Sequence, residues 1–338
     1  MKILGIETSC DECSAAVVEN GRTILSNEVA TQIELHRPYD GVVPEIASRL
    51  HTEWISSVVQ RSLDQAGVSL DEIDGIAVTN RPGLVGSLLV GLNFAKSLAY
   101  ARNIPFVGVD HIRAHLYAPH LEQEIAYPFL GLLVSGGHTV ISRVTGFDEI
   151  EVLGTTIDDA IGEAFDKVAK HYNMGFPGGV IVDRLSQKGD MHTYNFPDPS
   201  LHKGNHEFDV SYSGLKTAVI NQSDQFYTGK GEKSLENIAA SFQRAAVEIL
   251  MKRIRKALTF TGLKRVVAGG GVAANSLLRS ELKTLEGEVI FPSLKLCTDN
   301  GAMIAGIGYQ YLQRGDRDAY SLQAFPRVQA FKRSYPML

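Results

Sequence analysis

One order of strands and helices occurs twice along this chain, and that repetition limits the possible folds more than any other feature. Each copy is expected to begin with three strands joined by short turns and to continue through a helix, a strand, a helix and a strand. The first copy covers residues 2–109, and the second covers 129–292 around a loop-rich insertion that follows residue 171. Two copies of a β-β-β-α-β-α-β unit predict an α/β protein of two lobes with a cleft between them.

Apolar periodicity gives the expected bounds of these elements. In the first copy, strands are expected at 2–8, 14–18, 23–31, 73–78 and 104–109, and helices at 44–65 and 81–101. In the second copy, strands are expected at 129–134, 139–144, 149–153, 265–268 and 289–292, and helices at 158–171, 235–260 and 273–285, followed by a closing helix at 302–314. We expect lobe one to comprise residues 1–110, completed by 300–338, and lobe two to comprise 111–299 and to carry most of the ligand site.

A pair of histidines follows the last strand of the first copy. In Asp110-His111-Ile112-Arg113-Ala114-His115, the aspartate is a good N-cap, so both histidines are expected in the first turns of a helix. Four residues apart on a helix, they share one face and can reach one ion. A third ligand is needed, and the best candidate is Asp299, just ahead of the closing helix. The alternative is that the histidines are ordinary helix-face residues and Asp299 is an N-cap.

Two histidines and one carboxylate suit Fe(II) or Zn(II) and leave coordination positions open to a substrate. If these residues form such a site, His111, His115 and Asp299 would hold one divalent ion per chain, with Fe(II) favoured and Zn(II) possible.

Glycine-rich turns supply the candidate ligand contacts of the second copy. Ser135-Gly136-Gly137-His138 is expected in its first hairpin, where backbone amides can approach an anion, although a simple tight turn explains this motif better. Residues 269–275 place three glycines between a strand and a helix, which favours nucleotide binding and leaves Asn275 free to contact a base or ribose. Asp166 and Asp183 lie near further glycines and suit hydroxyl or ammonium groups, although Asp166 could equally form a surface salt bridge.

Charge, cysteine content and hydropathy narrow the class of protein. The net charge of −5 gives no global attraction to nucleic acid, so RNA contacts must come from local basic clusters. Residues 252–256 and 264–265 form such a cluster, which is equally well explained as a solvated helix face. Three cysteines are too few for a disulfide framework, and Cys10 and Cys13 fall in a hairpin and not at a helix start, so we expect no redox role. No apolar run is long enough to span a bilayer and no signal peptide is recognised, so a cytoplasmic location without membrane contact is expected.

Seven motifs occur together in one order, and they resemble those of the bacterial TsaD family of tRNA N6-adenosine threonylcarbamoyltransferases, once described as glycoproteases. The motifs are Glu7-Thr8-Ser9-Cys10-Asp11-Glu12, Gly41-Val42-Val43-Pro44-Glu45, Val134-Ser135-Gly136-Gly137-His138-Thr139, Gly162-Glu163-Ala164-Phe165-Asp166-Lys167, Ser213-Gly214-Leu215-Lys216-Thr217, residues 269–275 and Cys297-Thr298-Asp299-Asn300. The resemblance covers essentially the whole chain. It implies an α/β, two-lobed actin/hsp70/sugar-kinase-like fold.

The resemblance also implies the reaction and its site. Threonylcarbamoyl-adenylate would donate its threonylcarbamoyl group to N6 of the adenosine adjacent to the anticodon, at position 37, in tRNAs that read codons beginning with A. The metal ligands carry over as His111, His115 and Asp299, which are also the candidate catalytic residues. The donor-binding positions carry over as Leu133, Val134, Ser135, Gly136, Gly137, Asp166, Gly179, Asp183 and Asn275. The family works with other subunits, so we expect a TsaB-type paralogue and a TsaE-type ATPase as partners, besides the tRNA.

Three residues depart from the family pattern. Arg113 stands where an acidic residue is common, Arg81 replaces a glycine, and Cys13 stands where threonine is usual. Arg113 is two residues after His111, so it is expected to point away from the ligand face and to leave the ion in place.

Rival classes remain. An ATPase or kinase of the same fold has no need of the two histidines and Asp299. A non-catalytic scaffold subunit should lack all three, and a metalloprotease would need His-Glu-x-x-His.

Overall fold

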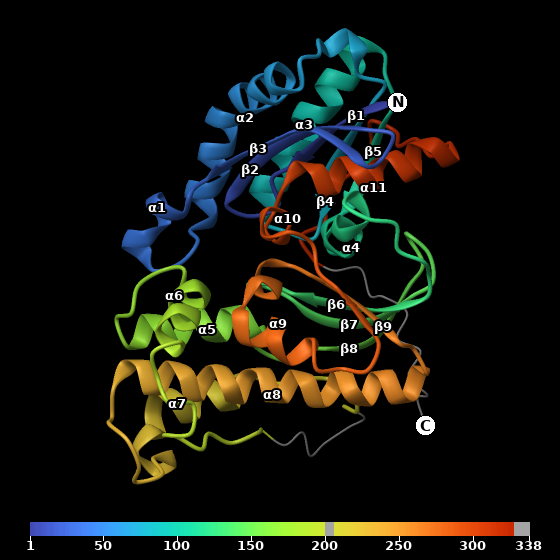
Figure 1. Cartoon of the computed structure of the whole chain (residues 1–338). Coiled ribbons are helices and arrows are strands. Elements are labelled where there is room, and N and C mark those ends of the chain that lie inside the picture. The colour runs from blue at the N-terminus through green and yellow to red at the C-terminus, as the bar shows by residue number, and fades with distance from the viewer. Residues whose placement is uncertain (200–205, 328–338) are drawn as a thin grey trace. The chain divides into compact units, whose positions relative to one another are not determined.

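The computed structural model describes residues 1–199 and 206–327, which form two compact units (Figure 1). Among these residues, unit 1 comprises 1–126 and 292–327, and unit 2 comprises 127–199 and 206–291. These boundaries differ from those expected at 110/111 and 299/300. The helix that carries the histidine pair packs against the closing helix, so both histidines and Asp299 belong to unit 1.

Unit 1 is built on a five-stranded sheet in the order β3-β2-β1-β4-β5. Its strands are β1 (Lys2–Glu7), β2 (Glu12–Glu19), β3 (Thr23–Thr31), β4 (Gly75–Arg81) and β5 (Phe106–Asp110). The first three strands are antiparallel, while β1, β4 and β5 run parallel to one another. Because the carboxyl ends of parallel strands meet at one edge, Glu7 at the end of β1 and Asp110 at the end of β5 lie at the same edge of this sheet.

Helices cover both faces of that sheet. Unit 1 contains α1 (Ile33–His36), α2 (Pro44–Ala66), α3 (Val85–Arg102), α4 (His111–Tyr117), α10 (Leu294–Cys297) and α11 (Gly301–Arg314), with 3-10 turns at η1 (Arg37–Tyr39), η2 (Leu70–Glu72) and η3 (Ala118–Leu121). Leu4 and Ile6 of β1 pack in one core with residues of α2 and α3. Gly5 faces the opposite side, where an added Cβ would lie 2.2 Å from the Gly301 carbonyl oxygen, so α11 packs directly on the strand backbone.

Unit 2 repeats the same topology. Its strands are β6 (Phe129–Val134), β7 (Thr139–Val144), β8 (Ile150–Thr155), β9 (Arg265–Gly269) and β10 (Glu288–Ile290). They follow the order β10-β9-β6-β7-β8. If β6 to β10 are matched in turn with β1 to β5, this is the strand order of the first sheet written from its other edge. In each sheet the first three strands therefore form an antiparallel meander. The fourth strand lies parallel to the first, and the fifth lies parallel to the fourth. The expected duplication is confirmed.

The helices of unit 2 correct two expectations. They are α5 (Ile161–His171), α6 (Gly178–Ser186), α7 (Ser213–Phe226), α8 (Leu235–Thr261) and α9 (Ser276–Leu282), with η4 (Gly271–Ala274). The insertion expected to be loop-rich contains α6 and α7. The single helix expected at 273–285 is instead η4 followed by α9, because Asn275 has an extended backbone and its side chain caps α9.

Candidate functional site

The histidine pair lies on α4, as the sequence predicts. The Asp110 carboxylate accepts hydrogen bonds from the backbone N–H groups of Ile112 and Arg113, at 2.9 and 3.3 Å, so it caps the helix. His111 and His115 then project from one face with their ring centroids 4.5 Å apart. Both side chains are buried, so their ring nitrogens need polar partners or an ion inside the protein.

Asp299 meets both rings. Its Oδ1 lies 3.0 Å from His115 Nε2 and 3.5 Å from His111 Nε2. Ligand atoms bound to one ion at about 2.1 Å lie roughly 3 to 3.5 Å apart, so these separations suit a shared ion. Within residues 1–199 and 206–327, these three side chains form the group of histidine, cysteine and carboxylate donors whose atoms converge closely enough, within 4.8 Å, to hold one.

The alternative role of Asp299, as a helix cap, does not hold. The N-cap of α11 is Asn300, whose side-chain oxygen accepts a hydrogen bond from the Met303 N–H at 3.0 Å. The carboxylate of Asp299 is directed instead to the histidines of α4. This contact joins two segments that lie 184 residues apart in the chain.

Glu7 is a functional residue that the sequence reasoning missed as part of this site. Its carboxylate lies 3.1 Å from Nδ1 of His111, and Ser9 Oγ lies 3.3 Å from the same nitrogen. A carboxylate at Nδ1 fixes the tautomer that presents Nε2 to an ion and increases the basicity of the ring. The available signal was a glutamate at the end of an otherwise apolar strand, because a charge that is fully buried needs a partner.

Burial and the nearby carboxylates act in opposite directions on the protonation of the two histidines. Burial disfavours a charged ring, but Asp299 and Glu7 outweigh it at His111 and raise its pKa to about 9. Burial also disfavours a charged Glu7, yet its contact with His111 outweighs that effect and lowers the pKa of Glu7. At His115 burial dominates, so its pKa is lowered and the ring is neutral. In the absence of a metal, a proton on His111 thus supplies the positive charge that the carboxylates demand.

The surroundings also favour a cation. Burial and the nearby carboxylates of Asp11 and Asp299 raise the pKa of Glu12 well above its usual range. Excess negative charge held in a buried region is relieved by a divalent ion, and two imidazoles with one carboxylate are donors suited to Fe(II) or Zn(II). The residues present therefore fit the metal that the donor spacing implies.

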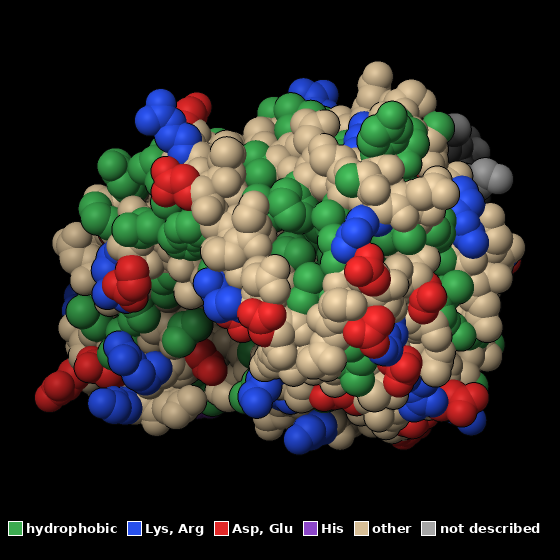
Figure 2. Space-filling model, turned by 90° about the horizontal axis from the view of Figure 1, so that it is seen from above, with side chains coloured by type: hydrophobic (Ala, Val, Ile, Leu, Met, Phe, Trp, Pro, Cys, Tyr) green, Lys and Arg blue, Asp and Glu red, His purple; other side chains and the backbone are tan. Residues whose placement is uncertain are grey.

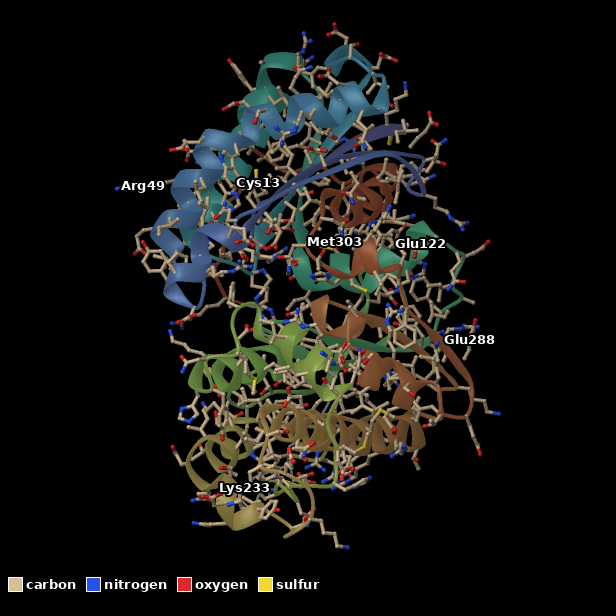
Figure 3. All side chains as sticks on the ribbon, turned by 60° about the vertical axis from the view of Figure 1, so that its left-hand side comes forward. Cys13, Arg49, Glu122, Lys233, Glu288 and Met303 are labelled. Carbon is tan, nitrogen blue, oxygen red and sulfur yellow. The ribbon has the colours of Figure 1, made fainter. Side chains whose placement is uncertain are left out.

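The cysteines near this site are poor candidates for redox chemistry. Cys13 lies inside unit 1, in contrast to Arg49, which projects from its surface (Figure 3). Burial raises the pKa of Cys13 to about 12, and burial and Asp11 raise the pKa of Cys10. Since the thiolate is the reactive form, both thiols are held in their unreactive state.

Cys13→Ala is accordingly expected to keep its catalytic activity in reducing and in oxidising buffer. The cavity it leaves should lower the free energy of unfolding by about 1 to 2 kcal/mol, a packing effect. Initial rates measured with and without a thiol reductant check this. A loss that depends on the redox state of the buffer would restore the redox interpretation.

The predicted donor-binding residues come together at one edge of the unit 2 sheet. Strands β6 and β9 are parallel, with Leu133 paired to Gly269, so the turns that follow them lie side by side. Gly270 has φ +91°, and a Cβ there would lie 2.4 Å from the Val134 carbonyl oxygen. The side chains of Leu133 and Val134 are buried, so only their backbone can meet a ligand. Gly136 and Gly137 are exposed and have nothing within 4 Å of an added Cβ.

Two further pairs extend this edge. Asp166 of α5 accepts a hydrogen bond from the Gly178 N–H at 2.7 Å, which joins α5 to the start of α6, where Gly179 also lies. Asp183 of α6 accepts hydrogen bonds from the backbone and hydroxyl of Ser276, the residue after Asn275. The two carboxylates therefore connect α5 to α6 and α6 to α9. Both Asp166 and Asp183 hydrogen-bond to neighbouring elements, so neither is an isolated surface charge.

The expectation that the Asn275 side chain is free is wrong. Its oxygen accepts from the Leu278 N–H at 3.0 Å, and its Nδ2 donates to Gln243 Oε1 at 3.0 Å. The side chain is 7% exposed. Asn275 thus shapes the turn between η4 and α9, with one amide hydrogen left for a ligand.

Gly162 is a second residue missed by the sequence reasoning. At the start of α5, a Cβ on it would lie 2.6 Å from the Ser135 carbonyl oxygen and 2.8 Å from Gly136 Cα. Only glycine lets the turn at 135–137 rest against this helix end. The sequence carries no local signal for this contact, because Ser135 and Gly136 belong to a different motif.

Gly162→Ala is expected to displace this turn and to raise KM for the nucleotide donor about tenfold, because small misplacements of a binding turn are costly. Gly146→Ala, in the turn after β7, is the matched control, because its added Cβ would come no closer than 3.4 Å to another atom, and it should change KM less than about threefold. Initial rates at varied donor concentration check the pair. Equal effects of the two substitutions would contradict the packing argument.

The two arginines that depart from the family pattern lie near Asp110. Arg81 Nε is 3.7 Å from the Asp110 carboxylate, and Arg113 Nη1 donates to the Tyr311 hydroxyl at 3.4 Å. Arg113 therefore points toward α11 and not to the metal ligands, in agreement with the expectation from its spacing.

Four cations of the basic cluster of unit 2 are paired with carboxylates, and Arg253 donates to a backbone carbonyl. The contacts are Lys252–Asp198 at 2.7 Å, Lys256–Glu207 at 2.7 Å, Arg265–Glu288 at 2.5 Å, Arg255–Glu281 at 3.9 Å, and Arg253 Nε to the Asp209 carbonyl at 2.9 Å. A face of unit 1, seen from above in Figure 2, likewise has cations and carboxylates interspersed. This pairing favours the solvated helix face over a phosphate-binding surface.

None of the helices in the described ranges combines the length and the apolar composition needed to cross a bilayer.

The chain resembles known proteins along its whole length. The family model described as "TsaD: tRNA N6-adenosine threonylcarbamoyltransferase" matches residues 23–306. A relative from Treponema denticola, named tRNA N6-adenosine threonylcarbamoyltransferase, is 64% identical over 334 residues, which are 98% of this chain and 99% of the relative.

Two solved structures show the same fold. HypF from T. kodakarensis has a TM-score of 0.62 at 15% identity and covers 93% of this chain and 48% of its own. ROK hexokinase from Thermus thermophilus has a TM-score of 0.50 at 18% identity and covers 93% of this chain and 100% of its own. These likenesses confirm the actin/hsp70/sugar-kinase-like fold. The family match and the near full-length relative, together with the two histidines and Asp299 brought to one place, show that this chain belongs to the TsaD family of tRNA N6-adenosine threonylcarbamoyltransferases.

Proposed function

We propose that this chain transfers the threonylcarbamoyl group of threonylcarbamoyl-adenylate to N6 of the adenosine at position 37, adjacent to the anticodon, in tRNAs that read codons beginning with A. The observation that carries the proposal is the convergence of His111, His115 and Asp299 in a chain of this family. A kinase of the same fold has no use for these three donors.

His111, His115 and Asp299 would hold one divalent ion, with Fe(II) favoured because two histidines and a carboxylate are its common donor set, and Zn(II) possible. When bound, the ion supplies Lewis acidity that polarises the carbonyl of the donor. Glu7 keeps the His111 ring oriented with Nε2 toward the shared position. Only three protein donors are committed, so substrate oxygens have room to enter.

The adenylate half of the donor is proposed to bind at the unit 2 edge described above. The exposed amides of Gly136 and Gly137 suit its phosphate, and the glycines around Gly270 let a nucleotide approach the backbone closely. Asp166, Asp183 and the region of Gly179 suit ribose hydroxyls, because a carboxylate has about four lone-pair sites and can accept from a hydroxyl in addition to a backbone N–H. Asn275 holds the turn against which the adenosine would rest.

In the proposed transfer, N6 of the tRNA adenosine attacks the carbonyl carbon of the mixed anhydride. A C–N bond forms, the bond from that carbon to the phosphate oxygen breaks, and AMP leaves with the electron pair while N6 loses a proton. An amine on an aromatic ring is a weak nucleophile, so orientation of the two reactants and polarisation of the carbonyl supply most of the acceleration.

Partners are proposed on the basis of charge. With a net charge of −5 and its basic cluster paired to carboxylates, this chain offers little attraction to tRNA phosphates. We propose that a TsaB-type paralogue and a TsaE-type ATPase act with it, and that they contribute to tRNA binding. Because the acceptor is a tRNA, the proposed site of action is the cytoplasm.

The test compares two acceptors. The protein, loaded with Fe(II) or Zn(II), is incubated with threonylcarbamoyl-adenylate, the partner subunits and a tRNA that reads A-starting codons, and the digested nucleosides are weighed. A second tRNA carries guanosine at position 37. Modified adenosine from the first tRNA only is the expected result. Modification of both, or of neither while ATP is turned over, would refute the proposed acceptor or the proposed reaction.

A further inference from the structure

His51 of α2 is a buried histidine outside the metal ligands. Its ring is fully buried, and Nε2 lies 2.8 Å from the carbonyl oxygen of Cys10. A carbonyl can only accept, so Nε2 carries the proton and donates it. The other ring nitrogen, Nδ1, is buried and has no hydrogen-bond partner. Burial lowers the pKa of His51, which keeps the ring neutral and its tautomer fixed.

Burying an imidazole ring at this position costs free energy. Leaving a buried acceptor unsatisfied costs free energy that an apolar side chain of similar size would avoid. The single polar contact of the ring is therefore the feature that explains a histidine here. That contact is made to the turn between β1 and β2.

This turn lies next to the proposed metal centre. It carries Ser9, whose N–H donates to the Glu7 carboxylate at 2.5 Å and whose Oγ lies 3.3 Å from His111 Nδ1. On its outer side, separate elements anchor successive residues of the turn. The Leu84 N–H donates to the Ser9 carbonyl at 2.8 Å, His51 donates to Cys10, and the Gln32 N–H donates to the Asp11 carbonyl at 3.1 Å.

Of these three anchors, His51 is the one made by a side chain. The other two are backbone contacts that remain whatever residue is present. The identity of residue 51 thus affects the position of the Cys10 carbonyl. It thereby affects how Ser9 and Glu7 are held against His111.

We propose that His51 is a positioning residue of the metal centre, which holds the turn that orients Glu7 and Ser9 against His111. The inference rests on the proposed metal site. It concerns geometry and not catalysis, since His51 touches neither a ligand nor a substrate position.

The test uses two amides that mimic different ring nitrogens. In His51→Gln the amide nitrogen can take the place of Nε2 and donate to Cys10, whereas in His51→Asn it takes the place of Nδ1 and leaves that carbonyl without its donor. Zn(II) affinity is measured by competition with a chromogenic chelator, and thermal unfolding of the metal-free proteins reports stability. We expect Asn to weaken Zn(II) binding about tenfold and Gln to stay within about threefold, with similar midpoints of unfolding.

Equal weakening by both substitutions, or by neither, would overturn the inference. Failure of the wild-type protein to bind Zn(II) would refute the proposed metal site itself, so the two failures are distinguishable. If His51→Asn does not fold, nitrogen-15 spectra of the wild-type histidines decide instead. The His51 signals should show a proton on Nε2 and should move when Zn(II) binds, and an unchanged His51 signal would contradict the proposed role.

Discussion

Asp299→Ala is expected to remove most of the bound metal and to lower kcat at least about a hundredfold, while much of the affinity for the adenylate remains. Loss of an electrophilic metal removes several kcal/mol of transition-state stabilisation, and each 1.4 kcal/mol is about tenfold in rate. The proposed adenylate contacts lie on other residues, so the loss should appear in kcat and not mainly in KM. Elemental analysis and steady-state kinetics measure the two effects.

His111→Ala and His115→Ala should lose metal in the same way. Arg113→Ala is the matched control, because Arg113 lies on the same helix but contacts Tyr311. It should keep one ion per chain. Full retention of metal in all three ligand variants would exclude the proposed centre, and a loss of affinity without a loss of turnover would exclude its role in the transition state.

The second large effect is expected at Glu7. Glu7→Gln keeps the shape of the side chain but removes the charge that faces His111 Nδ1, 3.1 Å away. Removing a carboxylate behind a metal-binding histidine costs about 10- to 100-fold in metal affinity. Chelator competition against Fe(II) or Zn(II) measures this directly.

Ser9→Ala is the comparison for Glu7→Gln. Its hydroxyl lies 3.3 Å from the same nitrogen, but the carboxylate remains as a partner for the ring. Affinity should fall less than about threefold. If Ser9→Ala weakened binding as much as Glu7→Gln, the charge on Glu7 would not be the cause, and hydrogen bonding to the ring by either residue would be the better account.

The repeated unit and the histidine pair could be predicted because their signals are local. Hairpin turns, alternating strands and the capping Asp110 each act over a few residues, so the start of α4 and the order of strands and helices in each copy could be predicted. The helix α6 is not predicted because it has only 9 residues and begins with Gly178 and Gly179, which are poor helix formers. The helix α7 has 14 residues, but the backbone of Gln222 is not helical and interrupts it.

Glu7 could not be found in this way. It is 104 residues from His111, and only the parallel arrangement of β1, β4 and β5 brings the two to one edge. The side chain of Asn275 is not free, because it caps α9 and donates to Gln243, while its contact with a ligand stays a prediction. The role of Gly162 likewise depends on a packing contact with Ser135 that no local pattern encodes.

The most direct test follows the carbonyl carbon. Threonylcarbamoyl-adenylate labelled with carbon-13 at this atom is mixed with the metal-loaded protein, its partner subunits and unmodified tRNA, and the digested nucleosides and released nucleotides are weighed. We expect one labelled threonylcarbamoyl group on adenosine N6 for each AMP released, and none with Asp299→Ala. Brisk ATP turnover that does not depend on Asp299, with no label in the tRNA, would mean that the fold is right and the reaction is that of an ATPase or kinase.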